Sequence, residues 1–183
     1  PACPYLSEDF SMNRAQKFTI DFEKADTRTH VLRTTLSLPL EIETAFDFFG
    51  DAANLENITP PELHFHIVTP RPIHMREGAR IDYHLRLFGI PLQWRTEISS
   101  WKPPEKFVDE QMQGPYRLWV HTHRFREMDG KTFIEDEVHY RLPLWPAGEI
   151  AHPLIRAQLT RIFRFRQRTI TEKLLKARQP PHA

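Results

Sequence analysis

Hydrophobic and polar residues alternate with a period of two through much of the chain between residues 63 and 140, a pattern typical of strands with one buried face. A threonine- and leucine-rich run at residues 30–38 predicts one further strand before them. The segments between the runs contain the Gly, Pro and Asp residues that tight turns need, so the strands are expected to pair antiparallel. The six later strands are expected at residues 63–67, 81–87, 92–98, 107–111, 119–125 and 134–140.

Helical spacing follows the first of these strands. Hydrophobic residues three and four positions apart predict a short helix from Ile42 to Phe49, which Gly50 would end in the left-handed conformation. A second short helix is expected to hold Leu55 and Ile58. These two helices separate the first strand from the other six.

A helix of about 28 residues is expected from Gly148 onward, ending before two prolines at residues 180 and 181. Pro153 fits only the first turns of a helix, so the helix could start there. One side of this helix is apolar and the opposite side is basic. The apolar side carries Ile155, Leu159, Ile162, Phe163 and Ile170, and the basic side carries Arg161, Arg164 and Arg168.

The order of elements predicts an α+β fold in which one curved antiparallel sheet of about seven strands wraps around the long C-terminal helix. A sheet that curls around a single helix leaves space between the two, where a ligand can bind. We expect an N-terminal extension at residues 1–27, the domain at 28–177 and a tail at 178–183. Within the extension, the alternation of Phe18, Ile20 and Phe22 predicts either an edge strand or an ordered arm.

Composition narrows the class of protein. The 183 residues fit one domain, and 16 prolines against 6 glycines favour short elements with stiff connections. The single cysteine, Cys3, cannot form a disulfide within the chain, and neither a secretory signal nor a membrane span is readable. We expect a cytoplasmic protein and interpret the basic helix side as a solvent-exposed face; contact with nucleic acid or an anionic membrane is the less favoured alternative.

The turn at Asp129 and Gly130 sets the register of the last two strands. It places His123 opposite Asp136 on the same face as the apolar residues of both strands, so these polar groups are expected to point inward. A short connection at residues 114–116 would bring Asp109 of the preceding strand next to His121. The expected polar row is therefore Asp109, His121, His123 and Asp136, framed by Tyr83, Trp94, Trp119 and Tyr140, with Gln111 on the same face and Arg166 of the long helix as a countercharge.

Several interpretations of this row stay open. The aspartates could simply orient the histidines in a self-satisfied network, or the row could face a ligand in an aromatic cavity. Two histidines two residues apart with an opposed carboxylate could also form a three-ligand metal face, but we expect no metal and no cofactor. His123 held by Asp136 has the parts of a general base for proton transfer.

Six stretches of the sequence resemble the bacterial ligand-binding branch of the SRPBCC superfamily, which includes START domains, polyketide cyclases and the birch-pollen allergen family. They are NLENITPP (54–61), IHMREG (73–78), GIPLQW (89–94), FVDEQ with GPY (107–111 and 114–116), WVHTH (119–123) and DEVHY (136–140). The resemblance covers residues 29–176 and implies a helix-grip fold with a deep hydrophobic cavity. It brings no catalytic motif that can be carried over to particular residues.

The first functional hypothesis is a binding protein for a small hydrophobic molecule such as a lipid, polyketide or aromatic metabolite, held between sheet and helix. The alternative is a cyclase- or dehydratase-like enzyme, with His123, Asp136 and His121 as catalytic candidates. The ligand-binding candidates are Tyr83, Trp94, Asp109, Gln111, Trp119, His121, His123, Asp136, Tyr140 and Arg166.

Overall fold

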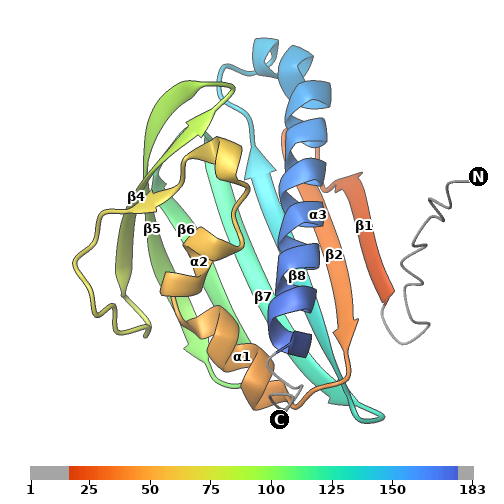
Figure 1. The fold of residues 1–183 in the computed structure, drawn as a ribbon. Coiled ribbons are helices and arrows are strands. Elements are labelled where there is room, and N and C mark those ends of the chain that lie inside the picture. Colours follow the sequence, from red (N-terminus) through yellow and green to blue (C-terminus); the bar gives the residue numbers. More distant parts are fainter. Residues whose placement is uncertain (1–16, 177–183) are drawn as a thin grey trace, which may run out of the picture.

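Eight strands form one antiparallel sheet in the computed structural model, which describes residues 17–176 (Figure 1). The sheet order is β1-β2-β8-β7-β6-β5-β4-β3. The strands are β1 (Lys17–Lys24), β2 (His30–Leu38), β3 (His66–Ile67), β4 (Arg80–Leu87), β5 (Ile90–Lys102), β6 (Lys106–Gln113), β7 (Leu118–Met128) and β8 (Lys131–Arg141). Every connection from β4 to β8 is a hairpin, as the turn residues predict.

The helices all lie on the concave side of the sheet (Figure 1). Helix α1 (Ile42–Gly50), helix α2 (Ala53–Asn57) and a 3₁₀ turn η1 (Pro61–Leu63) connect β2 to β3. A 3₁₀ segment η2 (Ala147–Ala151) leads into the long helix α3 (His152–Lys176), which crosses the sheet. The long helix is α-helical only from His152, which places Pro153 in its first turn, where a missing N–H costs nothing.

The expected α+β helix-grip architecture is confirmed, with one strand more than the seven expected. The additional strand is β1, which pairs with β2 over eight residues at the edge of the sheet. Its alternating Phe18, Ile20 and Phe22 pack against the hydrophobic core, so this part of the expected extension is an edge strand. Residues 1–16 and the expected tail at 178–183 lie outside the described residues.

The expected strand at residues 63–67 is wrong for most of its length. Pro60 and Pro61 fix backbone angles that begin a 3₁₀ turn, and His64 ends that turn with a positive φ of 43°. Only His66 and Ile67 pair with β4. Leu63 is buried as the alternation predicts, but it is buried by a turn.

Gly50 does not take the left-handed conformation expected for it. It is the last residue of α1, and Asp51 follows with extended backbone angles of φ −90° and ψ 106°. The ring of Trp101 explains a glycine at this position, because a Cβ there would lie 3.1 Å from the ring carbon Cη2. A glycine is therefore needed here because the backbone lies close to β5, and not because the chain turns.

The apolar side of α3 packs on the sheet as predicted. Leu159, Phe163, Ile170 and Leu174 are buried in the core. The opposite side is solvent-exposed, and Arg161 forms an ion pair of 2.7 Å with Glu62.

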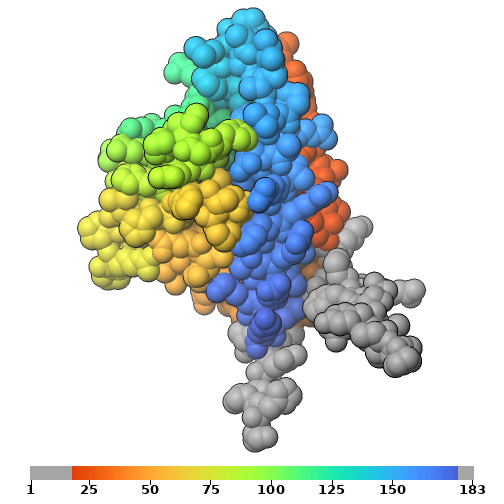
Figure 2. Space-filling view, turned by 45° about the horizontal axis from the view of Figure 1, so that its top comes forward, coloured from red at the N-terminus to blue at the C-terminus, as the bar shows by residue number. Residues whose placement is uncertain are grey.

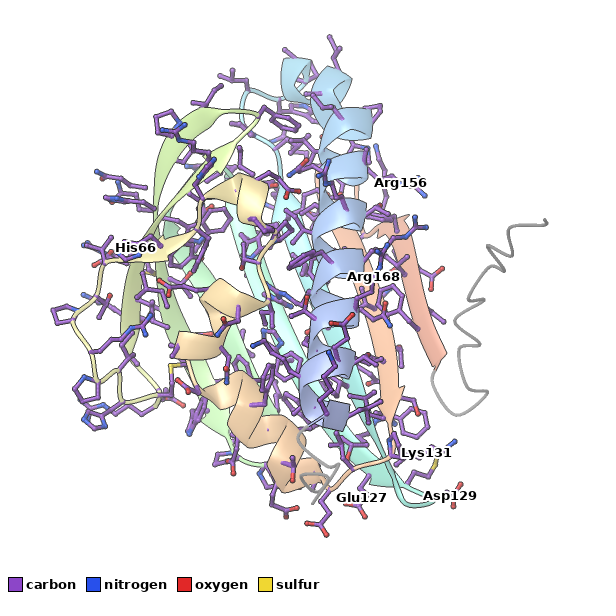
Figure 3. The ribbon with its side chains drawn as sticks, in the orientation of Figure 1. His66, Glu127, Asp129, Lys131, Arg156 and Arg168 are labelled. Atoms are coloured by element: carbon purple, nitrogen blue, oxygen red, sulfur yellow. The ribbon has the colours of Figure 1, made fainter. Side chains whose placement is uncertain are left out.

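Figure 3 places Arg156 and Arg168 along α3 and Asp129 at the tip of the β7–β8 hairpin. Figure 2 shows the α2 region and the β4–β5 hairpin reaching one flank of α3, while β1 reaches the other.

Candidate functional site

Neighbouring strands bring the polar row together as the register predicts. His123 lies opposite Asp136 across the β7–β8 pair, and Asp109 of β6 lies opposite His121. His121, His123 and Asp136 are buried, with exposed fractions of 4%, 5% and 7%. The three sidechains therefore point to the concave, helix-covered side of the sheet.

Each histidine lies between two carboxylates. His123 Nε2 is hydrogen-bonded to Asp109 Oδ2 at 3.1 Å, and His121 Nε2 is hydrogen-bonded to Asp136 Oδ1 at 3.3 Å. His121 Nδ1 lies 3.5 Å from Asp109 Oδ2. His123 Nδ1 lies 2.7 Å from Asp136 Oδ1, but its N–H direction does not make that close contact a hydrogen bond.

The electrostatics of the row separate the two histidines. Burial and the neighbouring charge of His123 lower the pKa of His121. Burial opposes protonation of His123 as well, but Asp136 and Asp109 outweigh it and raise the pKa of His123. Burial would raise both carboxyl pKa values, yet the histidines hold that of Asp109 below its usual range and that of Asp136 well below. The imidazole of His123 therefore binds a proton more readily than that of His121.

A cavity of about 160 Å³ opens in front of this row, between the sheet, the α1–α2 segment and α3. Aromatic rings make up much of its wall, including those of Tyr83, Trp94, Trp119 and Phe163. The volume is close to the ~150 Å³ of an apolar cavity that takes up benzene. A benzene-sized part of a guest fits without movement of the protein.

Arg166 supplies the positive charge on the cavity wall. Its guanidinium carbon lies 5.3 Å from the ring centroid of Phe163. The Nε atom is buried and has no hydrogen-bond partner among residues 17–176, and the charge contributes to the low pKa of Asp109. A positive charge on the cavity wall favours a guest with an acidic or hydrogen-bond-accepting group.

Seven of the ten ligand-binding candidates line the cavity: Tyr83, Trp94, Asp109, Trp119, His121, His123 and Arg166. The other three lie elsewhere. The Gln111 amide is hydrogen-bonded to the backbone of Tyr116 and holds the β6–β7 turn. Asp136 lies behind the histidines, where the hydroxyl of Thr34 donates to its Oδ2 at 3.1 Å. The Tyr140 hydroxyl is hydrogen-bonded to His152 Nε2 at 3.1 Å under the start of α3.

Among the wall residues outside the candidate set, two pack against His123, and the sequence carries a signal for both. Phe49 follows the helical spacing of α1, and Phe107 has the strand parity of Asp109. The ring of Phe107 stacks on His123 with centroids 4.1 Å apart, and Phe49 meets the same histidine at 5.8 Å. Both rings help to exclude water from His123.

A second buried cluster lies at the start of α3, apart from the cavity. The rings of His30 and His152 stack with centroids 3.8 Å apart, and His30 Nε2 lies 2.9 Å from Glu149 Oε2. Periodicity could not indicate this cluster, because it joins β2 to η2 and to the first residue of α3, which are far from β2 in the sequence. It ties the beginning of α3 to the sheet.

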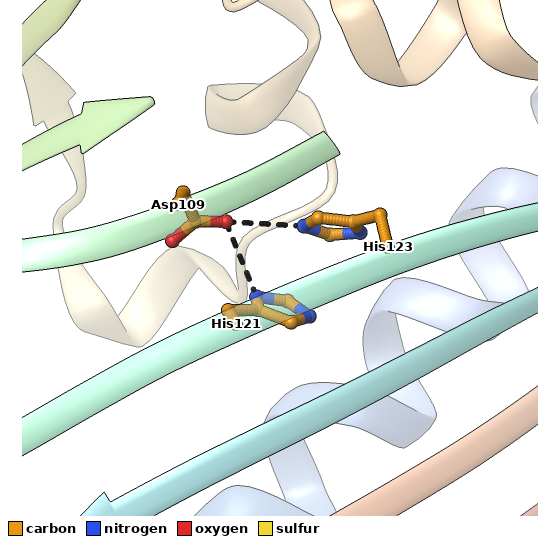
Figure 4. Close-up of side chains that lie close together, drawn as sticks. All are labelled: Asp109, His121 and His123. Atoms are coloured by element: carbon orange, nitrogen blue, oxygen red, sulfur yellow. Dashed lines mark hydrogen bonds and ion pairs between the residues drawn. The ribbon is translucent and has the colours of Figure 1, made fainter. Parts of the chain in front are cut away.

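Asp109, His121 and His123 are the described residues whose donor atoms could hold a metal ion together (Figure 4). Asp109 offers an oxygen between the two rings, and all three side chains line the cavity. The arrangement can therefore do one of three things: hold itself in place, exchange protons with a guest, or ligate an ion.

No protein-family model and no curated protein matches the sequence. Among solved structures, the chain is similar to protein Ms6760 from Mycobacterium smegmatis, with 18% identity over 88% of this chain and 100% of that chain and a TM-score of 0.61. An aromatase/cyclase, Zhui, from Streptomyces sp. R1128 matches at 12% identity over 82% and 96% of the two chains, with a TM-score of 0.67. Major latex-like protein 151 from Panax ginseng matches at 12% identity over 80% and 98%, with a TM-score of 0.57.

These likenesses show the fold. The chain shares the helix-grip fold with these proteins, as the sequence resemblance implied. Within residues 17–176, no helix combines the length and hydropathy that a membrane span requires.

Proposed function

We propose that the protein is a cytoplasmic binding protein for a small, largely apolar molecule that carries one acidic or hydrogen-bond-accepting group. The observation that carries the proposal is the aromatic cavity of about 160 Å³ with the positively charged Arg166 on its wall. Burying a ring-sized apolar surface stabilises the complex by roughly 25 cal/mol per Å². The lone Cys3 gives no reason to assign an oxidising compartment.

Toluene is a suitable first probe because it matches the size of the cavity. The chain contains 4 tryptophans, of which Trp94 and Trp119 line the cavity while Trp101 and Trp145 do not. Toluene binding should shift the indole N–H signals of Trp94 and Trp119 in a saturable way and leave the other two in place. Absence of a saturable shift, or equal shifts of all four signals, would contradict the proposal. Native mass spectrometry of freshly purified protein then identifies any guest that copurifies.

An enzyme is the second candidate, and the opposite pKa shifts of two adjacent histidines favour it. The pKa of His123 is raised and that of His121 is lowered, so the pair offers a proton donor and a proton acceptor at the wall of the same cavity. Such a pair suits proton transfer on an enolisable guest, as cyclisation and dehydration require. The fold is shared with an aromatase/cyclase, which is compatible with this chemistry and does not assign it.

Hydrogen–deuterium exchange at the methyl group of acetophenone tests this second candidate. Acetophenone is an enolisable ketone with a single ring, and NMR follows its exchange in deuterated buffer. The protein should accelerate the exchange, and His121→Gln should remove the acceleration. His139→Gln is the matched control, since His139 lies on the outer face of β8 beside Glu137. Exchange at the rate of buffer alone, or equal rates for both variants, argues against catalysis.

A further inference from the structure

We propose that Asp109, His121 and His123 form a binding site for a divalent transition-metal ion, with zinc as the reference ion. The proposal departs from our sequence-based expectation of no metal, and it stands whether or not the cavity takes up an organic guest. Its basis is the position of three donor atoms on two neighbouring strands (Figure 4).

The spacing of the donor atoms is that of a ligand set. Asp109 Oδ2 lies 3.1 Å from His123 Nε2 and 3.5 Å from His121 Nδ1, and the three atoms all lie within 4.8 Å of one another. Donor atoms bound at about 2.0–2.2 Å to one ion lie roughly 3 to 3.5 Å apart. The two separations that involve Asp109 Oδ2 already have this length.

The backbone fixes this arrangement before any ion binds. His121 and His123 are two residues apart on β7, so their side chains share one face, and Asp109 is the cross-strand partner of His121 on β6. Phe107 stacks on the ring of His123 and limits its rotation. Ligands on paired strands lose little entropy when an ion binds.

Asp136 gives the site the outer carboxylate that histidine ligands commonly have. Its Oδ1 accepts a hydrogen bond from His121 Nε2 at 3.3 Å and lies 2.7 Å from His123 Nδ1. Both contacts use the ring nitrogen remote from Asp109, which leaves the other nitrogen of each ring directed at the shared oxygen. Asp136 itself is held by Thr34 and does not line the cavity.

Charge balance is also compatible with an ion. Two carboxylates and two neutral imidazoles carry two negative charges, which one divalent ion neutralises. An ion of this kind costs less to bury than an unpaired one. Two nitrogen donors and one oxygen favour a transition metal over magnesium or calcium, which prefer oxygen ligands alone.

The open side of the site faces the cavity. Three protein ligands leave at least one position on the ion for water or for a group of the guest, as in catalytic zinc sites. The positive charge of Arg166 on the same wall adds to the preference for an anionic group there. The ion would polarise such a group without any further residue.

The test uses the full chain without an affinity tag, stripped with EDTA and dialysed into chelator-free buffer. Calorimetry should show one zinc ion per chain with a Kd of about 10 µM or tighter. His123→Gln and Asp109→Asn should each weaken binding at least about 100-fold, and Asp136→Asn about 10-fold to 100-fold. His139→Gln removes an outward-facing histidine that lies 3.2 Å from Glu137 and should change nothing.

A measurement on the unmodified chain guards against variants that fail to fold. Zinc should shift the ¹⁵N signals of His121 Nδ1 and His123 Nε2 and leave those of His139 in place. A Kd weaker than about 1 mM, zinc binding that both ligand variants leave unchanged, or a titration that shifts neither ring nitrogen overturns the proposal. A self-contained ion-pair network would give that result.

Discussion

Thr34 donates a hydrogen bond of 3.1 Å to Asp136, although 102 residues separate the two in the sequence. The two residues are cross-strand partners in the β2–β8 pair, and both are buried. Through Asp136, this contact reaches both histidines of the cavity wall. Strand β2 therefore takes part in the site although none of its residues lines the cavity.

Thr34→Val should lower the free energy of unfolding by about 2 kcal/mol, because it removes a hydrogen bond to a buried charge and preserves the side-chain shape. Thr35→Val is the matched control on the outward face of the same strand and should change stability by less than about 0.5 kcal/mol. Urea unfolding at neutral pH measures both, with unchanged m-values. Equal effects of the two variants would show that Asp136 does not depend on Thr34.

Arg166→Met should change which guests the cavity prefers. Benzoate and benzyl alcohol have similar size, and only benzoate brings a negative charge to the guanidinium. The unmodified protein should bind benzoate at least about tenfold more tightly, and Arg166→Met should remove that difference by removing the charge. The indole N–H signals of Trp94 and Trp119 report both titrations. A variant that keeps the preference would place the acidic group elsewhere.

Gly130→Ala should destabilise the protein by about 1 to 2 kcal/mol, because Gly130 has a φ of +69° in the β7–β8 turn. Asp129 precedes it with a φ of +53°, and Asp129→Asn should be nearly neutral since asparagine tolerates this region. Thermal unfolding compares the two variants. If both lower Tm equally, the turn does not have the strain that its backbone angles imply.

The contribution of His152 to stability should fall on acidification. Burial and the charge of His30 lower the pKa of His152 in the folded state, while Glu149 opposes them and Lys24 and Arg156 add to the lowering. The unfolded chain therefore binds a proton at His152 more readily than the folded protein does. Protonation favours the unfolded state, so the free energy of unfolding decreases as pH falls through about 6.5.

Urea unfolding of the unmodified protein and His152→Gln between about pH 7.5 and about pH 5.5 measures this effect. Glutamine retains a partner for the Tyr140 hydroxyl and does not titrate. The stability of the unmodified chain relative to the variant should decrease toward the acidic end. A constant or increasing difference would mean that His152 is protonated at no cost.

The sequence predicts the polar row well because one local signal determines its register. Asp129 and Gly130 fix the β7–β8 hairpin, and alternation then places His121, His123 and Asp136 on the buried face. Alternation does not predict which residues of that face reach the cavity and which are covered by other side chains. Asp136 and Tyr140 lie on the same face of the sheet as Trp119, yet packing under Thr34 and under His152 keeps them off the cavity wall.

Other features needed the tertiary structure. Gly50 carries a strong sequence signal for a helix end, but a glycine is needed there because of the ring of Trp101, which is 51 residues later in the sequence. Leu63 has strand parity, while neighbouring prolines impose a turn. The approach of His30 to His152 depends on how α3 crosses the sheet, which no short pattern contains.

The β4 edge is the part of the sheet next to which the cavity wall can move, because its neighbour β3 has only two residues. In the described chain, residues 70–77, which connect β3 to β4, are paired to no strand, and Met75 from this connection contributes to the cavity wall. Methionine adapts its shape easily, so this wall can move outward without breaking any hydrogen bond of the sheet. A molecule with two or three fused rings would therefore enlarge the pocket toward β3, while the histidine wall on β7 stays rigid.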